Sequence, residues 1–278
     1  MKKEIFFEDV KNLVEEMFGK ETSIKEIVKP AEAYTGLHLN GETVAACVSL
    51  DKLYEDYAND VVTAAEKAVA VIKKGMHMDI DLSLTQNWDC VKEKVYKVLL
   101  PKTNGVDLEK VPYKEVAGDM VEFYYVDVKV GEEDGRFMLN NELIQKYGVT
   151  KEEVEAQANA NTQALKGLRI FPIGDILNDI VDRDDSTVLF VMTNNESYYG
   201  AATILYPGVE KEIKKVIKRE YFLIPSSVHE WLITEKGKMP LEYINSMIQS
   251  INKDSLLETE VLSDHAYELV DGVLHAAT

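Results

Sequence analysis

The chain has 278 residues with 31 basic and 49 acidic side chains, so its formal net charge is −18. Proteins that bind nucleic-acid phosphates are usually basic and rich in arginine, whereas this chain has four arginines, at positions 136, 169, 183 and 219. This composition argues against direct nucleic-acid binding, and no apolar run approaches the ~18 residues that a membrane-spanning helix needs.

The cysteines and the first residues indicate a compartment. Cys47 and Cys90 are the two cysteines, and their positions form neither a disulfide framework nor a zinc motif. Acidic residues interrupt the apolar stretch that follows Met1, so we expect no signal-peptide core. The expectation is a soluble protein in the reducing cytoplasm.

The N-terminal region predicts the order α-β-β-β-α. Apolar residues at helical spacing indicate a first helix that Gly19 ends. Asn40-Gly41 is typical of a type I′ hairpin turn, because both positions must tolerate positive φ. Gly75 is expected to end the last helix. The predicted elements are a helix over residues 4–18, strands over 22–28, 33–39 and 43–50, and helices over 51–58 and 60–74.

The rest of the chain predicts a long strand and helix, followed by the order β-β-α-β-β-α-β. Thr150 with Glu153 three positions later is the capping-box pattern that starts a helix. Pro240 suits the first turn of another helix. The predicted elements are a strand over residues 120–130, an acidic turn over 131–135, a helix over 150–165, strands over 187–193 and 198–206, a helix over 209–219, strands over 221–224 and 229–234, a helix over 240–252, and strands over 266–270 and 273–275.

Helices and strands do not alternate strictly along the chain. This order favours an α+β fold, with antiparallel sheets packed by helices, over a doubly wound parallel sheet. We expect two lobes, residues 1–115 and 116–278, with one continuous unit as the alternative.

A polar stretch between two late strands is the leading candidate for a catalytic site. Ser226, Ser227, His229 and Glu230 lie within five positions, and Asp264 offers a distant acid. A hydroxyl beside an imidazole is the minimum for acyl transfer. However, the chain has no G-x-S-x-G elbow. We therefore favour a turn whose serines bond to backbone groups, and keep the catalytic site as the alternative.

Metal and cofactor sites have weaker support. On a strand, His77, Asp79 and Asp81 would share one face and could bind a divalent cation. A half-buried strand with one wet face explains the same alternation. Neither G-x-x-x-x-G-K-[ST] nor G-x-G-x-x-G occurs, so we expect no nucleotide cofactor.

Several segments in combination resemble a known family. They are Asn161-Thr162, Ile170-Phe171-Pro172, Val191-Met192-Thr193-Asn194, Tyr199-Gly200-Ala201-Ala202, Leu205-Tyr206-Pro207, Ile224 to Glu230 and Leu262-Ser263-Asp264. The combination resembles a family of uncharacterised clostridial gut-bacterial proteins, classed as a domain of unknown function. The resemblance implies a bacterial, cytoplasmic protein and brings no established activity, so it assigns no functional residue.

Three functions stay open at this point. The favoured one is a non-enzymatic binding or regulatory protein that engages another protein through a tyrosine-rich surface, because tyrosine is enriched at interfaces. The first alternative is a hydrolase-like enzyme that uses the Ser-Ser-x-His-Glu stretch. The second alternative is an acidic mimic that blocks a nucleic-acid-binding protein.

Overall fold

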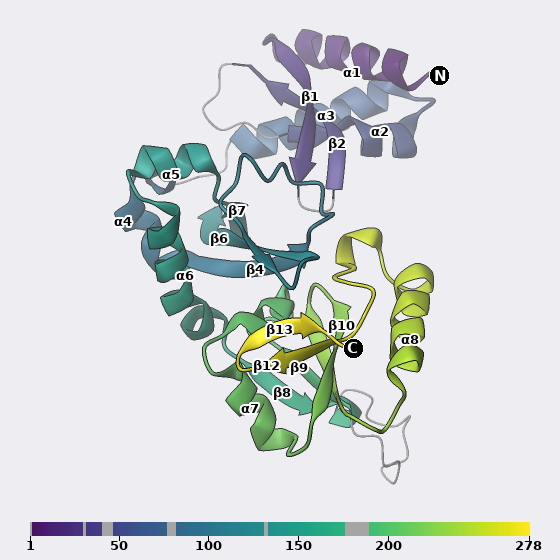
Figure 1. Cartoon of the computed structure of the whole chain (residues 1–278). Coiled ribbons are helices and arrows are strands. Elements are labelled where there is room, and N and C mark those ends of the chain that lie inside the picture. The colour runs from purple at the N-terminus through teal and green to yellow at the C-terminus, as the bar shows by residue number, and fades with distance from the viewer. Residues whose placement is uncertain (1, 30–31, 41–46, 77–81, 131–132, 176–188) are drawn as a thin grey trace. The chain divides into compact units, whose positions relative to one another are not determined.

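The computed structural model describes residues 2–29, 32–40, 47–76, 82–130, 133–175 and 189–278 (Figure 1). The chain divides into two compact units, Met1–Asp81 with Val130–Glu133, and Leu82–Lys129 with Asp134–Thr278. Helices pack against sheets whose described strand pairings are antiparallel. The α+β class predicted from the sequence is therefore confirmed.

The first unit packs α-helices against a three-stranded sheet of order β1-β2-β3. Helix α1 buries Phe6, Val10 and Val14, which recur on one face of the helix and pack in one cluster with the apolar residues of α3. The predicted order is confirmed, with two helices after the third strand. The elements are α1 (Lys3–Phe18), β1 (Thr22–Lys29), β2 (Glu32–Leu39), β3 (Cys47–Ser49), α2 (Leu50–Tyr57) and α3 (Val61–Met76).

Two predicted ends in this unit differ in outcome. Gly19 ends α1 as predicted, because it adopts the left-handed conformation with φ 68° and donates its N–H to the carbonyl of Glu15. Gly75 does not end α3, which continues to Met76. Gly41 of the predicted hairpin turn and the first half of the strand predicted over 43–50 lie outside the described residues, and residues 47–49 of that strand form β3.

The second unit contains two sheets. One has the order β4-β6-β5 with β7 paired to β6, and the other is a six-stranded sheet of order β13-β12-β10-β11-β9-β8. Figure 1 shows the β12–β13 hairpin in yellow beside β10. The elements are α4 (Trp88–Val91), β4 (Val95–Pro101), β5 (Lys114–Val116), β6 (Met120–Val130), β7 (Glu133–Met138), α5 (Asn141–Tyr147), α6 (Lys151–Lys166), β8 (Arg169–Pro172), β9 (Phe190–Thr193), α7 (Val209–Val216), β10 (Tyr221–Ser227), β11 (Glu230–Glu235), α8 (Leu241–Asp254), β12 (Tyr267–Val270) and β13 (Val273–Ala276), with short 3-10 helices η1 (Leu82–Thr85), η2 (Lys92–Lys94), η3 (Ile173–Asp175), η4 (Gly200–Leu205) and η5 (Glu258–Glu260).

The division between the units differs from the predicted lobes. Residue 115 lies inside β5, which pairs with β6 of the same sheet, so a boundary there would cut a hydrogen-bonded ladder. The compact units instead separate between residues 81 and 82. The acidic turn predicted over 131–135 is wrong for residues 133–135, which belong to β7. Residues 131 and 132 lie outside the described residues.

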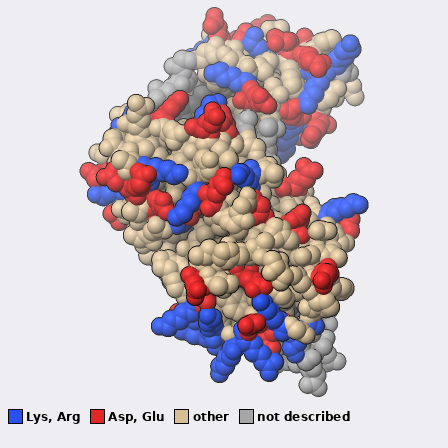
Figure 2. Space-filling model, in the orientation of Figure 1, with Lys and Arg blue, Asp and Glu red and all other residues tan. Residues whose placement is uncertain are grey.

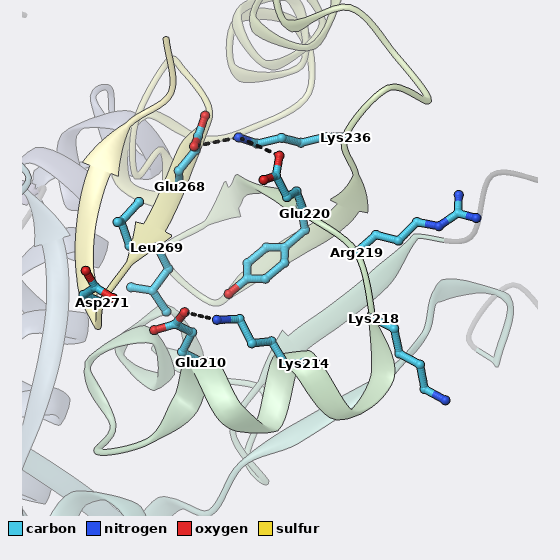
Figure 3. A pocket seen from close by; sticks show the side chains of 11 residues that line it. Glu210, Lys214, Lys218, Arg219, Glu220, Lys236, Glu268, Leu269 and Asp271 are labelled. Atoms are coloured by element: carbon cyan, nitrogen blue, oxygen red, sulfur yellow. Dashed lines mark hydrogen bonds and ion pairs between the residues drawn. The ribbon is translucent and has the colours of Figure 1, made fainter.

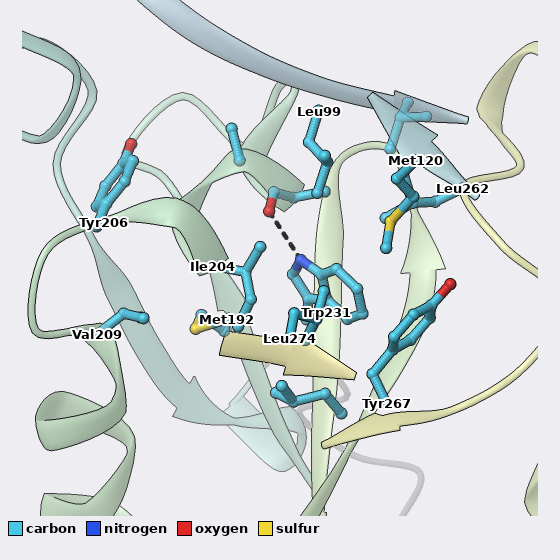
Figure 4. Packing of buried hydrophobic residues seen from close by; sticks show 14 of the residues in the cluster. Leu99, Met120, Met192, Ile204, Tyr206, Val209, Trp231, Leu262, Tyr267 and Leu274 are labelled. Carbon is cyan, nitrogen blue, oxygen red and sulfur yellow. Dashed lines mark hydrogen bonds between the residues drawn. The ribbon is translucent and has the colours of Figure 1, made fainter. Parts of the chain in front are cut away.

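One apolar core joins the two sheets of the second unit (Figure 4). Trp231 of β11 lies at its centre and is fully buried. Its indole Nε1 donates to the carbonyl oxygen of Ala201 at 2.8 Å, and its ring meets Tyr267 edge-on at 5.6 Å. Leu99 and Met120 reach the same cluster from the smaller sheet. The core therefore depends on segments far apart in the sequence.

The strand predicted over residues 198–206 is wrong. This segment forms a loop and the 3-10 helix η4. Gly200, Ala201, Ala202, Thr203 and Ile204 are buried consecutively, whereas a half-buried strand alternates. Tyr199 begins the segment in the left-handed conformation with φ 50°, which no regular strand contains.

Candidate functional site

The polar stretch from Ser226 to Glu230 joins β10 to β11, whose pairing shifts register between Pro225 and Ser227. The hydroxyl of Ser226 donates to Oε1 of Glu230 at 3.2 Å. The hydroxyl of Ser227 accepts the backbone N–H of His229 at 3.0 Å. Both serines therefore bond within their own turn, as short hydroxyl side chains do in tight connections.

The imidazole of His229 has partners that are distant in sequence. Its Nδ1 accepts the backbone N–H of Tyr199 at 3.0 Å, so the proton of the neutral ring lies on Nε2. Nε2 lies 3.9 Å from Oε1 of Glu260. Neither Ser226 nor Ser227 hydrogen-bonds to this ring. The site therefore holds an oriented imidazole beside a carboxylate, with the nearby hydroxyls bonded elsewhere.

Asp264 contacts a different histidine. Its exposed carboxylate lies 2.9 Å from Nδ1 of His265. The neighbouring Ser263 donates its hydroxyl to Asp119 at 2.7 Å, and Tyr267 bonds to the same carboxylate oxygen at 2.5 Å. Of the predicted site residues, Ser226 therefore contacts Glu230, and Ser227 contacts the backbone of His229. Asp264 instead pairs with His265.

The environment of His229 predicts a pH-dependent contribution to stability. Burial lowers its pKa below the usual value, and the carboxylates of Glu260 and Glu230 partly oppose this shift. Below about pH 6.5 the unfolded state therefore binds more protons than the folded state, so stability falls as the pH falls. We expect the free energy of unfolding to decrease more steeply from pH 7 to pH 5 in the wild type than in a His229→Gln variant, measured by urea titration. Parallel pH profiles would contradict this assignment.

Two tyrosine rings lie beside His229 and an arginine lies over both of them; we call Arg136, Tyr198, Tyr199 and His229 the tyrosine surface. The His229 ring centroid lies 5.0 Å from that of Tyr198 and 5.8 Å from that of Tyr199. Cζ of Arg136 lies 4.2 Å from the Tyr198 ring centroid, within cation–π range. Tyr198 is 41% exposed. The surface therefore presents an aromatic ring and a guanidinium group to solvent.

The aromatic contacts continue from this surface into the unit. Tyr199 contacts Tyr125 at 6.1 Å between centroids, and Tyr125 contacts Tyr96 at 6.2 Å. Burial, together with the adjacent Tyr198, raises the pKa of Tyr199 to about 12. Its hydroxyl therefore stays protonated at neutral pH and can donate a hydrogen bond.

The loop that carries Tyr198 and Tyr199 is held by its own side chains. The Asn194 side chain accepts the N–H groups of Glu196 and Tyr198, at 3.0 and 3.3 Å, and donates to the carbonyl of Tyr198 at 2.8 Å. Ser197 and Tyr199 both adopt positive φ, at 52° and 50°. Such conformations cost on the order of 1 kcal/mol each and persist where the surroundings enforce them.

Two glycines allow close packing around the loop, and Gly167 also has the positive φ of 69° that favours glycine. A Cβ on Gly200 would overlap Oγ1 of Thr193 and the carbonyl oxygen of His229, and a Cβ on Gly167 would overlap the Asn195 side chain. Glycine is therefore required at both positions to bring α6, the loop and β11 together.

Lys166 ties the loop to the smaller sheet. Its side chain is buried, and Nζ donates to Asp127 at 2.6 Å and to Glu196 at 2.9 Å. The same ammonium lies 4.1 Å from the Tyr96 ring centroid. These contacts, with the hydrogen bond from Tyr199 to His229, make the tyrosine surface a fixed arrangement.

The family model described as "Family of unknown function (DUF5688)" matches residues 3–269 of this chain. The chain belongs to this family. The resemblance to a domain of unknown function is therefore confirmed. Comparison of this DUF5688 member with curated proteins and with solved structures finds no match in either set.

The DUF5688 chain has a cavity of about 800 Å³ lined in part by α7 and β12 (Figure 3). Lys214 pairs with Glu210, and Nζ of Lys236 lies 2.7 Å from Glu268 and 4.0 Å from Glu220. Pairs in contact with solvent, as the partly exposed Lys236–Glu268 pair is, contribute little to stability and are screened by salt. We therefore interpret this cavity as a salt-bridged part of the surface.

The second unit also carries a local basic cluster. Figure 2 shows lysines and arginines gathered over α7, while acidic and basic side chains are mixed over much of the rest of the face drawn. The exposed members of the cluster on α7 and just after it are Lys211, Lys214, Lys215, Lys218 and Arg219. On this face, the net negative charge does not form one continuous acidic surface.

The predicted metal ligands His77, Asp79 and Asp81 lie outside the described residues. Within the described part of the chain, no group of three or more His, Cys, Asp and Glu side chains is arranged to hold a metal ion. No helix in that part has both the length and the apolar character needed to cross a membrane.

Proposed function

We propose that this protein is a non-enzymatic binding or regulatory protein that engages another protein through the tyrosine surface. The observation that carries the proposal is the exposed Tyr198 ring, held on a strained loop with the Arg136 guanidinium 4.2 Å from its centroid. Tyrosine and arginine are the residue types enriched among side chains that dominate binding energy.

The rigidity of the loop supports the same proposal. Ordering a flexible side chain on binding costs about 0.5–1.5 kcal/mol, and a surface that is already ordered avoids part of this cost. Arg136 is exposed and forms no ion pair with another described residue. A partner that presents a carboxylate to Arg136 and an apolar group to Tyr198 would match this chemistry.

The two alternatives have less support. A hydrolase needs its nucleophile beside the base, whereas the Ser227 hydroxyl accepts the N–H of His229 rather than bonding to the imidazole. An acidic mimic needs a continuous acidic face, and the face in Figure 2 mixes both signs of charge.

Substitution of Tyr198 tests the proposal. Affinity capture from native host cells, quantified by mass spectrometry, should recover a protein with the wild-type chain and lose most of it with Tyr198→Ala. Removing such a contact costs on the order of 2 kcal/mol, or roughly 30-fold in Kd, which a titration with the purified partner would measure. Arg136→Gln should weaken the same interaction.

Tyr243→Ala is the matched control, because Tyr243 is a 59% exposed tyrosine on α8, outside the tyrosine surface. It should capture the same protein as the wild type. If every captured protein binds the Tyr198→Ala variant as tightly as the wild type, while circular dichroism shows a folded chain, the proposal is wrong.

We further propose a clostridial, cytoplasmic setting for this interaction. The family resemblance supports the bacterial origin, and a chain with two cysteines suits a reducing compartment. Fractionation of native host cells with an antibody against the chain would test the location.

A further inference from the structure

A separate cavity of about 640 Å³ lies in the second unit, between the β4–β6–β5 sheet and the segments around η4, α7 and the β12–β13 hairpin. This volume falls within the range of small-molecule sites. Its apolar lining includes Ile204, Leu205, Val209, Leu269, Val273 and Leu274. The cavity thus has the size and the apolar surface that a small organic ligand needs.

A buried ion pair contributes to the lining. Nζ of Lys97 lies 3.1 Å from Oε2 of Glu122, and the two side chains are 6% and 2% exposed. Removing two charges from water is costly, so a buried pair is weak support for a purely stabilising role. Charged side chains that converge on an apolar cavity are typical of binding sites.

The second oxygen of this carboxylate is unused. Oε1 of Glu122 is buried and forms no hydrogen bond of ordinary geometry with a described residue; the Tyr124 hydroxyl, which interacts with the same carboxylate, forms none either. An ionised carboxylate has about four lone-pair sites on its two oxygens and can accept from two ammonium groups at once. Glu122 can therefore serve Lys97 and one further donor.

The charges of the lining favour a cationic donor. After each charged side chain is matched with its ion-pair partner, one carboxylate remains in excess, that of Asp271, which forms no ion pair with a described residue. The charged side chains that do form ion pairs are Lys97 with Glu122, Lys114 with Glu155, Glu115 with Lys102 and Glu210 with Lys214.

We propose that this cavity binds a small organic molecule that carries a protonated amine on an apolar body. The ammonium group donates to Oε1 of Glu122 once that side chain turns toward the cavity, because Oε1 is buried. The apolar body lies along the aliphatic side chains of the cavity. The excess carboxylate of Asp271 offsets the added positive charge. This site is independent of the tyrosine surface and of the partner proposed for it.

Three probes with one hydrocarbon chain test the head-group chemistry. The full-length chain, labelled at isoleucine and leucine methyl groups, is titrated at pH 7 with hexylamine, 1-hexanol and hexanoate and followed by NMR. Hexylamine should shift the methyl signals of Ile204, Leu205 and Leu274 saturably. Hexanol should bind about tenfold more weakly, since hydrogen bonds between charged groups are stronger than neutral ones. Hexanoate should not bind.

Two variants place the ligand in this cavity. Val273 lines the cavity and is 55% exposed, so Val273→Trp should fill space without disturbing the core and weaken hexylamine binding at least about tenfold. Val62→Trp, at a 53% exposed position on α3, is the control and should bind as the wild type does.

The Glu122→Gln substitution should weaken hexylamine binding about tenfold and change hexanol binding little, since the amide keeps the shape of the carboxylate and loses its charge. If this variant fails to fold, Val273→Trp still decides the location. The proposal is overturned if hexanoate binds as well as hexylamine, if hexylamine gives no saturable shift, or if Val273→Trp leaves its affinity unchanged.

Discussion

Replacing Lys97 with methionine should lower the free energy of unfolding by about 3–5 kcal/mol. The substitution keeps an unbranched side chain but leaves the carboxylate of Glu122, which is 2% exposed, without its ammonium partner. Breaking a buried pair is costly because the remaining charge has neither water nor a counter-ion. Urea unfolding followed by circular dichroism would measure the loss.

A second substitution separates the charge from the packing. The double variant Lys97→Met with Glu122→Met should recover most of the lost stability, because no buried charge remains. Lys102→Met is the matched control, since its pair with Glu115 is exposed and should cost no more than about 1 kcal/mol. A double variant as unstable as Lys97→Met would show that the buried charge is not the cause.

Replacing Trp231 with alanine should also lower the free energy of unfolding by about 3–5 kcal/mol. The ring is fully buried where the two sheets of the second unit meet, and its removal would leave a cavity among Leu99, Met120 and Tyr267. The hydrogen bond to Ala201 would be lost as well. Denaturant unfolding monitored by circular dichroism would test this prediction without relying on tryptophan fluorescence.

A Trp231→Phe variant would separate the loss of ring packing from the loss of the indole hydrogen bond. Trp231→Phe keeps an aromatic ring and removes the indole donor, so its cost should be smaller and should include the unpaired carbonyl of Ala201, about 1–3 kcal/mol. Tyr243→Ala, at an exposed position, should change stability by less than about 0.5 kcal/mol. A loss below about 1 kcal/mol for Trp231→Ala would contradict the central role of this ring.

Local signals in the sequence were sufficient to predict many elements of the fold. The capping box at Thr150 and Glu153 forms as expected, with bonds of 2.8 and 3.2 Å between each side chain and the other residue's backbone N–H. Gly19 ends α1 for an equally local reason. Residues 198–206 were mispredicted because their apolar run is typical of a strand, while tertiary contacts of Gly200 and Trp231 impose a 3-10 helix.

The candidate sites were only partly visible in the sequence. The stretch from Ser226 to Glu230 was identified by its polar side chains, but its partners Tyr199 and Glu260 are about 30 positions away in either direction and carry no linked motif. A usable signal did exist for the buried pair. Lys97 and Glu122 each interrupt a strongly apolar strand, and a charge in such a run requires a buried partner.

The shared core of the second unit also orders events during translation. Asp119 and Tyr267 bond across 148 positions, so at roughly 5–20 residues per second the ribosome makes the second about 7–30 s after the first. Until β9, β10 and β11 are made, the face of β4 and β6 that includes Val98 and Phe123 has no sheet to cover it, and the covering sheet stays incomplete until β12 follows. The nascent chain therefore exposes an aggregation-prone apolar surface during synthesis. Binding of a ribosome-associated chaperone would protect this surface until β12 emerges.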